Sequence, residues 1–246
     1  MKETGIIFQG WGVTAILEGR KTMTRRTQGL QRINENPDAW ILSSVGILNC
    51  PSHKAHGKYG ATFRLKSNPE FCEFIPCPFG GPGDLLWVRE TWCPRSNGAL
   101  LLEQIQRPFY RATDGENDMK KPYSWPWHPS IHMFRWASRI TLEVVSVKVE
   151  RLQEISPYDA LMEGVNLPVP PGCEISKHPN DFQTWTKKKQ DSWLEDQART
   201  TYFARCIDAE NHVREFPDIW EKINGPESWK ANPWVWPIEF KRIEGR

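Results

Sequence analysis

Short apolar runs that alternate with polar residues dominate the chain and predict more strand than helix. The longest alternation covers 140–151, and the adjacent Val144 and Val145 interrupt it, which predicts a bulge. Shorter strands are predicted at 5–8, 40–45, 61–65, 85–90, 108–112 and 234–243. Pro237 lies within the last of these. Because proline has no amide hydrogen to donate, it predicts an edge position for that strand.

Helices are fewer in the pattern. They are predicted at 13–18, 156–163, 184–211 and 216–224. Gly19, Gly164 and Gly225 follow three of them, and glycine readily takes the left-handed conformation that ends a helix. Ser156 and Pro157 form a helix start, with serine as the cap and proline at the first helical position.

Strands and helices do not alternate regularly along the chain, so the order disfavours a doubly wound sheet. It predicts an α+β fold, mainly β, built as a small, partly open β-barrel decorated with helices. We expect one domain over 1–246, with insertions at about 27–76, 93–129 and 165–212.

Composition and charge narrow the class of protein. No window approaches the roughly 18 consecutive apolar residues that a membrane helix needs, and the first residues carry no secretory signal. The formal net charge is only +2, so any affinity for nucleic acid must come from a local patch. We therefore expect a cytoplasmic protein, monomeric and without a membrane partner.

Six cysteines in a chain without a secretory signal are expected to be reduced thiols. Cys50, His53, Cys72 and Cys77 have residue types that bind zinc, although their spacing matches no standard finger. The sequence thus predicts no cofactor, with zinc at these four residues as the alternative.

A basic stretch carries the candidate chemistry. Lys21 and Thr24 follow the turn at Gly19, and no acidic residue occurs between Arg20 and Arg32. Such a concentration of cations favours an anionic partner and lowers the pKa of a neighbouring lysine. The alternative is a solvated basic loop after a short helix.

Glu163 is the second unusual residue, because it ends a short helix. A carboxylate at a helix C-terminus opposes the helix dipole by a few tenths to about 1 kcal/mol. Its position indicates a role other than solubility.

Several blocks together resemble the ASCH domain of the PUA-like superfamily. They are Ile-Leu-Glu-Gly-Arg-Lys-Thr-Met-Thr-Arg-Arg at 16–26, Gly-Asp at 83–84, the helix at 156–164 and Trp-Pro-Ile-Glu-Phe at 236–240. The blocks at 82–92 and 131–140 more closely resemble ASCH proteins encoded by phages and prophages, which would place this one in the bacterial host cytoplasm.

The resemblance implies a pseudo-barrel with a cleft for RNA or a nucleobase. Some small bacterial ASCH proteins are metal-independent amidohydrolases that remove the acetyl group from N4-acetylcytidine with a Lys, a Thr and a Glu. The matching positions here are Lys21, Thr24 and, from the short helix, Glu163. The chain is more than twice the size of a minimal ASCH domain, so its insertions can cover the cleft or retarget it.

Three functions remain open at this stage. The first is an amidohydrolase acting on an acylated pyrimidine nucleoside. The second is a reader module that binds nucleic acid, RNA in preference to DNA, without catalysis, and the third is a phage structural or host-interaction protein. The residues expected to contact nucleic acid or a nucleobase are Trp11, Arg20, Arg25, Arg26, Arg89, Arg135 and Trp136.

Overall fold

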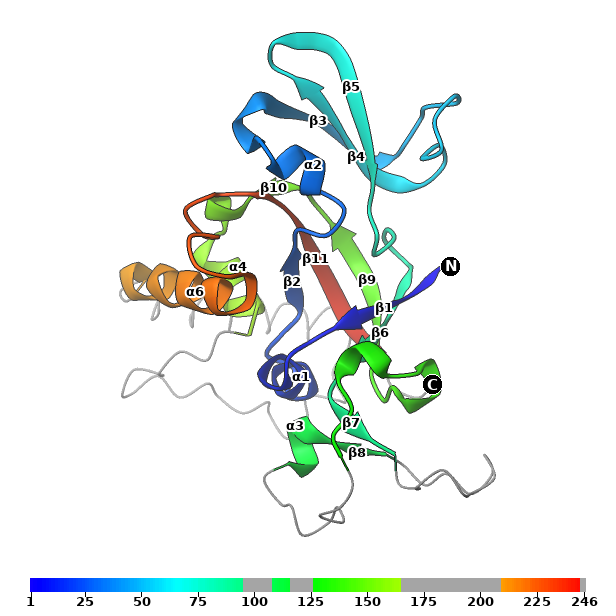
Figure 1. The fold of residues 1–246 in the computed structure, drawn as a ribbon, viewed down its shortest axis with the longest axis vertical. Helices are drawn as coiled ribbons and strands as arrows, with labels where there is room; N and C mark the ends of the chain where they lie inside the picture. The colour runs from blue at the N-terminus through cyan, green and yellow to red at the C-terminus, as the bar shows by residue number, and fades with distance from the viewer. Residues whose placement is uncertain (95–107, 116–125, 165–208, 244–246) are drawn as a thin grey trace, which may run out of the picture.

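The computed structural model describes residues 1–94, 108–115, 126–164 and 209–243, and it confirms a mixed fold that is mainly β (Figure 1). The largest sheet curls, and its strands follow the order β1 (Glu3–Ile7), β6 (Leu85–Arg89), β9 (Thr141–Val147), β11 (Trp234–Ile243) and β10 (Glu150–Arg151). A sixth strand, β2 (Met23–Arg26), pairs with β11. Among the paired strands of the described ranges, β1 and β6 alone run parallel.

The last strand is not at an edge, and the prediction from Pro237 was wrong. Ile238 pairs with Thr24 of β2 and with Val147 of β9, so β11 has neighbours on both sides. The Lys148 N–H donates to the Pro237 carbonyl at 3.0 Å. The missing N–H of Pro237 therefore faces the break between β9 and β10, where it interrupts no regular ladder.

The predicted bulge is confirmed. Along β11 the partner of Glu239 is Ser146, and the partner of the next residue, Phe240, is Val144. Val145 is therefore the extra residue of β9 and is 43% exposed, which explains the break in the apolar pattern.

The first predicted insertion forms a second sheet at the top of Figure 1. It contains α2 (Gln31–Asn34), a 3₁₀ turn (Pro37–Ala39) and the antiparallel strands β3 (Trp40–Ile47), β4 (Tyr59–Leu65) and β5 (Asn68–Pro76). Phe63 of β4 belongs to the same buried cluster as Trp236 of β11, and the Tyr59 hydroxyl donates to the Val147 carbonyl at 3.1 Å. The two sheets thus share one hydrophobic core.

The second predicted insertion contributes a small two-stranded sheet at the opposite end, of β7 (Trp92–Cys93) and β8 (Phe109–Tyr110). The strand predicted at 108–112 is shorter than expected because α3 (Arg111–Asp114) follows at once. The Asp114 carboxylate accepts the Tyr110 N–H at 2.8 Å, which favours the turn into the helix. Short 3₁₀ turns follow at Ser130–His132, Arg135–Ala137 and Leu152–Glu154.

Three helices lie beside the large sheet: α1 (Gly10–Leu17), α4 (Pro157–Met162) and α6 (Ala209–Asn224). The Ser156 hydroxyl accepts the Asp159 N–H at 3.1 Å, which confirms the predicted cap, and Gly19, Gly164 and Gly225 all have left-handed φ angles. Residues 184–208 of the predicted long helix lie outside the described part of the chain, as does most of the third insertion.

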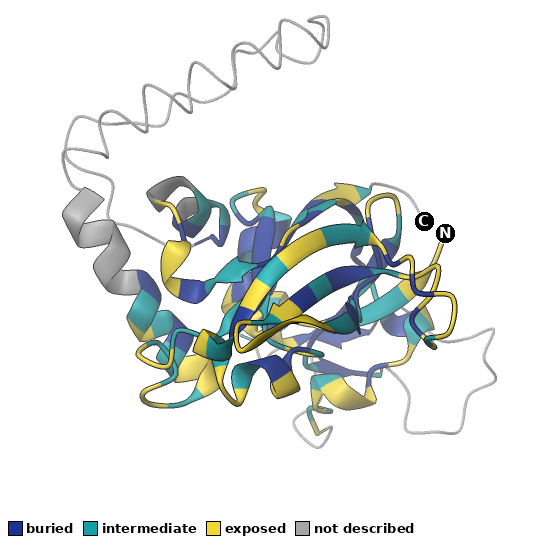
Figure 2. Ribbon diagram, turned by 90° about the horizontal axis from the view of Figure 1, so that it is seen from above, coloured by how far each residue is buried: buried dark blue, intermediate teal, exposed yellow. Residues whose placement is uncertain are grey.

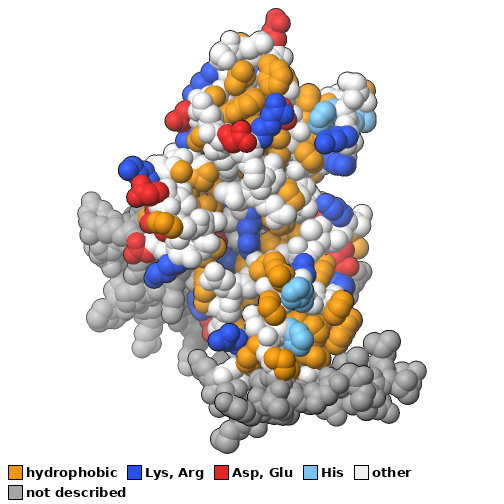
Figure 3. Space-filling model, viewed as in Figure 1, with side chains coloured by type: hydrophobic (Ala, Val, Ile, Leu, Met, Phe, Trp, Pro, Cys, Tyr) orange, Lys and Arg blue, Asp and Glu red, His pale blue; other side chains and the backbone are white. Residues whose placement is uncertain are grey.

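Buried residues concentrate where the strands overlap, and exposed residues occupy the loops and outer faces (Figure 2). Near the middle of the face in Figure 3 the surface is hollowed, and Lys or Arg atoms are visible inside the hollow. In the described ranges, no helix is long and apolar enough to cross a membrane.

Candidate functional site

The junction between α1 and β2 positions the first site residues. After Gly19 turns the chain, the N–H groups of Arg20 and Lys21 both donate to the Ala15 carbonyl, at 2.9 and 3.0 Å. The Thr22 N–H then donates to the Met162 carbonyl at the end of α4, at 2.9 Å. This backbone bond brings the C-terminus of α4 beside Lys21.

Lys21 and Glu163 form a buried ion pair across 142 positions of the chain. Lys21 Nζ lies 2.6 Å from Glu163 Oε2 and also donates to the Glu163 carbonyl at 2.7 Å. Lys21 is 4% exposed and Glu163 5%. Gly164 permits this approach, because a Cβ at that position would lie 2.8 Å from Lys21 Cβ and its φ is +79°.

The pair lines a pocket of about 280 Å³ together with Thr24. Thr24 is buried, and its hydroxyl makes no hydrogen bond to any residue that the structure describes. Phe8, Trp11 and Trp220 contribute aromatic side chains to the lining. The pocket thus combines an apolar wall with a lysine, a carboxylate and a hydroxyl.

Burial lowers the pKa of Lys21, the charge of Glu163 opposes that shift, and the charges of Arg26 and Arg25 add to it. A buried ion pair rarely stabilises a fold more than apolar residues of the same volume would. A lysine with a lowered pKa inside a pocket is instead typical of a functional site.

Arg25 is enclosed by carboxylates. Its side chain is 0% exposed, and its guanidinium contacts Glu150 Oε1 at 2.7 Å, Asp159 Oδ2 at 2.7 Å and Glu163 Oε1 at 3.4 Å. Burial lowers the pKa of Arg25, but the charges of Glu163 and Glu150 outweigh burial, so the pKa of Arg25 is raised. Arg25 therefore holds Glu163 in place and has no face left for a phosphate.

Arg26 lines the pocket with a fixed guanidinium. Its Nη2 donates to the Ile7 carbonyl at 2.6 Å, and its Cζ lies 4.9 Å from the centre of the Phe8 ring. Its Nε is buried without a hydrogen-bond partner among the described residues. Burial lowers the pKa of Arg26, and Glu163 opposes the shift.

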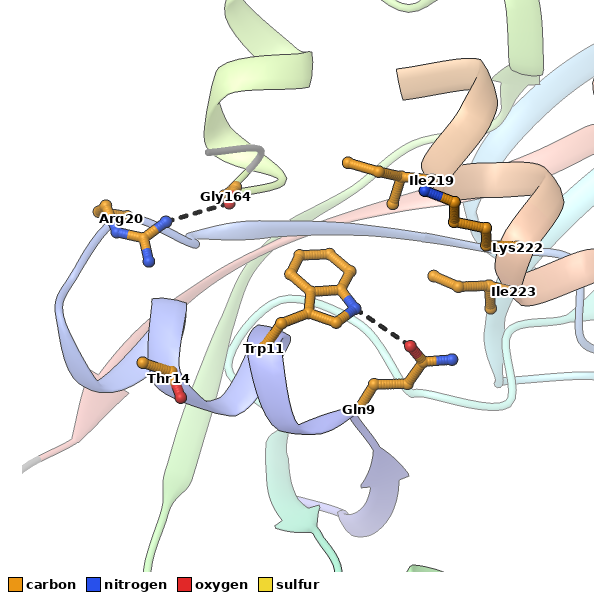
Figure 4. A pocket seen from close by; sticks show the side chains of 8 residues that line it. All are labelled: Gln9, Trp11, Thr14, Arg20, Gly164, Ile219, Lys222 and Ile223. Carbon is orange, nitrogen blue, oxygen red and sulfur yellow. Dashed lines mark hydrogen bonds between the residues drawn. The ribbon is translucent and has the colours of Figure 1, made fainter. Parts of the chain in front are cut away.

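A second pocket of about 470 Å³ adjoins the first and shares Trp11 with it. Figure 4 shows the Trp11 ring between α1 and the side chains of Ile219 and Ile223 on α6. The Trp11 indole donates to Gln9 Oε1 at 3.1 Å. Arg20 lies at the other end of this pocket, where it donates to the Gly164 carbonyl at 3.1 Å.

Three of the predicted nucleic-acid contacts lie elsewhere. Arg89 and Trp136 line a third pocket, and Arg135 pairs with Glu3 at 2.7 Å. Sequence reasoning missed three of the aromatic residues that line the site: Phe8, Phe216 and Trp220. The only available signal was the spacing of apolar residues at 216, 219, 220 and 223 on α6.

The zinc alternative gains no support from the described residues. Within them, no group of three or more His, Cys, Asp and Glu side chains is placed to hold a metal, and Cys50, His53, Cys72 and Cys77 are not gathered. Burial raises the pKa of the Cys77 thiol to about 11. The His53 Nδ1 accepts the Ala55 N–H at 3.1 Å.

Comparison of the chain with protein-family models, curated proteins and solved structures finds no match.

Proposed function

We propose that this protein is an ASCH-type amidohydrolase of the PUA-like superfamily that removes an acyl group from the N4 atom of a cytidine, with N4-acetylcytidine as the model substrate. One observation carries the proposal: Lys21 Nζ and Glu163 Oε2 lie 2.6 Å apart in a pocket that Thr24 also lines. These are the three positions that the sequence resemblance assigns to catalysis.

Amide hydrolysis needs a nucleophile, a base and a donor for the oxyanion. Thr24 Oγ1 attacks the acyl carbon, and Lys21 Nζ accepts the hydroxyl proton. A lowered pKa supports this role, because only the neutral amine accepts a proton. We assign the oxyanion to the guanidinium of Arg26, the cation that lines the pocket beside Lys21 and Thr24.

The second half of the reaction releases cytidine. The bond between the acyl carbon and N4 breaks, and N4 takes the proton that passes from Lys21 through Glu163. Water then hydrolyses the acyl ester on Thr24 to give the carboxylic acid and the free hydroxyl. Arg25 orients Glu163 for this transfer through its contact with Oε1.

The size and walls of the pocket support a single base as the ligand. A volume of about 280 Å³ is just below the range for drug-sized ligands, about 300 to 1,000 Å³, and suits a smaller molecule. Phe8, Trp11 and Trp220 offer aromatic surface for a pyrimidine ring.

The reader function is less favoured at this pocket. It requires Arg25 and Arg26 to meet phosphates, but Arg25 is saturated by carboxylates and Arg26 is held by the Ile7 carbonyl and the Phe8 ring. The structural or host-interaction function gives no reason for a buried lysine in a pocket.

The test measures the release of cytidine from N4-acetylcytidine, with chromatography as the detection method. The wild type should release cytidine, Thr24→Val should lose at least about a hundredfold in rate, and Thr24→Ser should retain activity because it keeps the nucleophile. Equal activity of Thr24→Val and the wild type would exclude Thr24 as the nucleophile, and no release by the wild type would exclude this substrate.

A further inference from the structure

A third pocket, of about 530 Å³, lies at the lower end of the molecule and is rich in aromatic side chains. Trp92 is buried beneath it and packs edge-to-face against Trp136 and Phe134, with ring centres 5.6 and 6.4 Å apart. The Trp136 and Phe134 side chains are 49% and 63% exposed. We call Trp92, Phe134 and Trp136 the aromatic shelf. Figure 3 shows hydrophobic and histidine side chains gathered on this part of the surface.

The charged groups of this pocket favour an anion. Arg89, His128 and His132 line it, and none of its described lining residues is acidic. Two of its N–H donors, Arg89 Nε and Trp92 Nε1, are buried without a hydrogen-bond partner in the described chain. Buried donors are normally paired, so these two indicate a missing acceptor.

The shelf adjoins the proposed catalytic pocket through backbone contacts. Arg89 of the shelf pocket pairs in register with Ile7, which lines the catalytic pocket. The Phe8 N–H donates to the Arg89 carbonyl at 3.1 Å, and Phe8 also lines the catalytic pocket. The two pockets therefore lie against neighbouring strands of the same sheet.

We propose that the aromatic shelf binds the nucleotide next to the modified cytidine, so that the protein acts on a single strand of RNA in preference to the free nucleoside. This inference rests on the proposed function for the identity of the neighbouring base. An exposed aromatic surface beside cationic groups binds an unpaired base and its phosphate. The base stacks on Trp136 or Phe134, and the phosphate lies beside Arg89, whose Nη2 also donates to the Ile131 carbonyl.

The experiment measures binding and hydrolysis separately. A fluorescent single-stranded oligoribonucleotide that contains one N4-acetylcytidine is titrated by anisotropy into Thr24→Val protein, which does not consume it. The Kd of the Thr24→Val protein is compared with the Kd of two double variants, which carry Trp136→Ala or Phe134→Ala in addition to Thr24→Val. Phe71→Ala is the matched control, because Phe71 is an aromatic residue of similar exposure on the sheet at the opposite end of the molecule.

Loss of one stacking partner should raise Kd about five- to 150-fold, and Phe71→Ala should leave it unchanged. In protein with Thr24 intact, the shelf variants should hydrolyse free N4-acetylcytidine at the wild-type rate. Unchanged Kd in both shelf variants would overturn the proposal, and so would equally tight binding of the corresponding DNA strand. If shelf variants weaken RNA binding while the wild type releases no cytidine, the shelf stands and the proposed hydrolysis fails.

Discussion

Arg25 offers the sharpest test of the site's architecture, through the substitution Arg25→Met. Methionine keeps an unbranched apolar stem of similar length but removes the guanidinium that contacts Glu150, Asp159 and Glu163. Removing one partner from a buried ion-pair network leaves uncompensated charge and costs about 3–5 kcal/mol. We expect a loss of that size in the free energy of unfolding at pH 7, measured by urea denaturation.

Arg32→Met is the matched control, because Arg32 pairs with Glu73 at 3.0 Å but its side chain is 62% exposed. An exposed pair contributes about 0–1 kcal/mol. Lowering the pH toward 4.5 should shrink the cost of Arg25→Met. Burial raises the pKa of Glu150, and the charge of Arg25 opposes that rise. Without Arg25 the folded variant therefore keeps a proton on Glu150 that the unfolded chain releases, and acid favours the folded variant. Equal, small losses in both variants would refute the assignment of Arg25 as the centre of a buried network.

Three further predictions address the site and the core. Catalytic efficiency toward N4-acetylcytidine should rise with pH through an ionisation below 10.5, because burial lowers the pKa of Lys21. Glu163→Gln should move that ionisation to lower pH, because the charge of Glu163 raises the pKa of Lys21. A move to higher pH in the pH–rate profile would contradict this. Gly164→Ala should reduce activity at least tenfold, because the new Cβ would lie 2.8 Å from Lys21 Cβ and the backbone there is left-handed. Wild-type kinetics in this variant would show that the ion pair tolerates displacement. Alkylation of the native protein at pH 8 should modify the partly exposed Cys72 well before Cys77, whose pKa is raised to about 11; peptide mass spectrometry that finds Cys77 modified first would count against its burial.

The sequence singled out Lys21, Thr24 and Glu163 as candidates because each left a local signal. The first two share a short basic stretch after a glycine, and Glu163 stands at a helix end where a carboxylate opposes the dipole. The three residues line one pocket because the Thr22 N–H donates a hydrogen bond to the Met162 carbonyl. No local pattern in the sequence predicts that hydrogen bond.

Partners that lie far along the chain leave no local signal in the sequence. Arg25 was expected to contact nucleic acid, and its carboxylate partners in the fold are 125 to 138 positions away. Pro237 looked like an edge residue because its missing N–H is visible in the sequence, whereas the break between β9 and β10 that accommodates it is not. Strand β5 was not predicted because asparagine, proline and glutamate obscure its alternation.

The most direct measurement of the central claim is the rate at which Lys21→Met and Glu163→Gln release cytidine from N4-acetylcytidine, beside the wild type and Arg32→Met. The account predicts release by the wild type and by Arg32→Met, with a loss of at least about a hundredfold in each of the other two, the scale expected when a general acid or base is removed. Wild-type rates in folded Lys21→Met protein would contradict it.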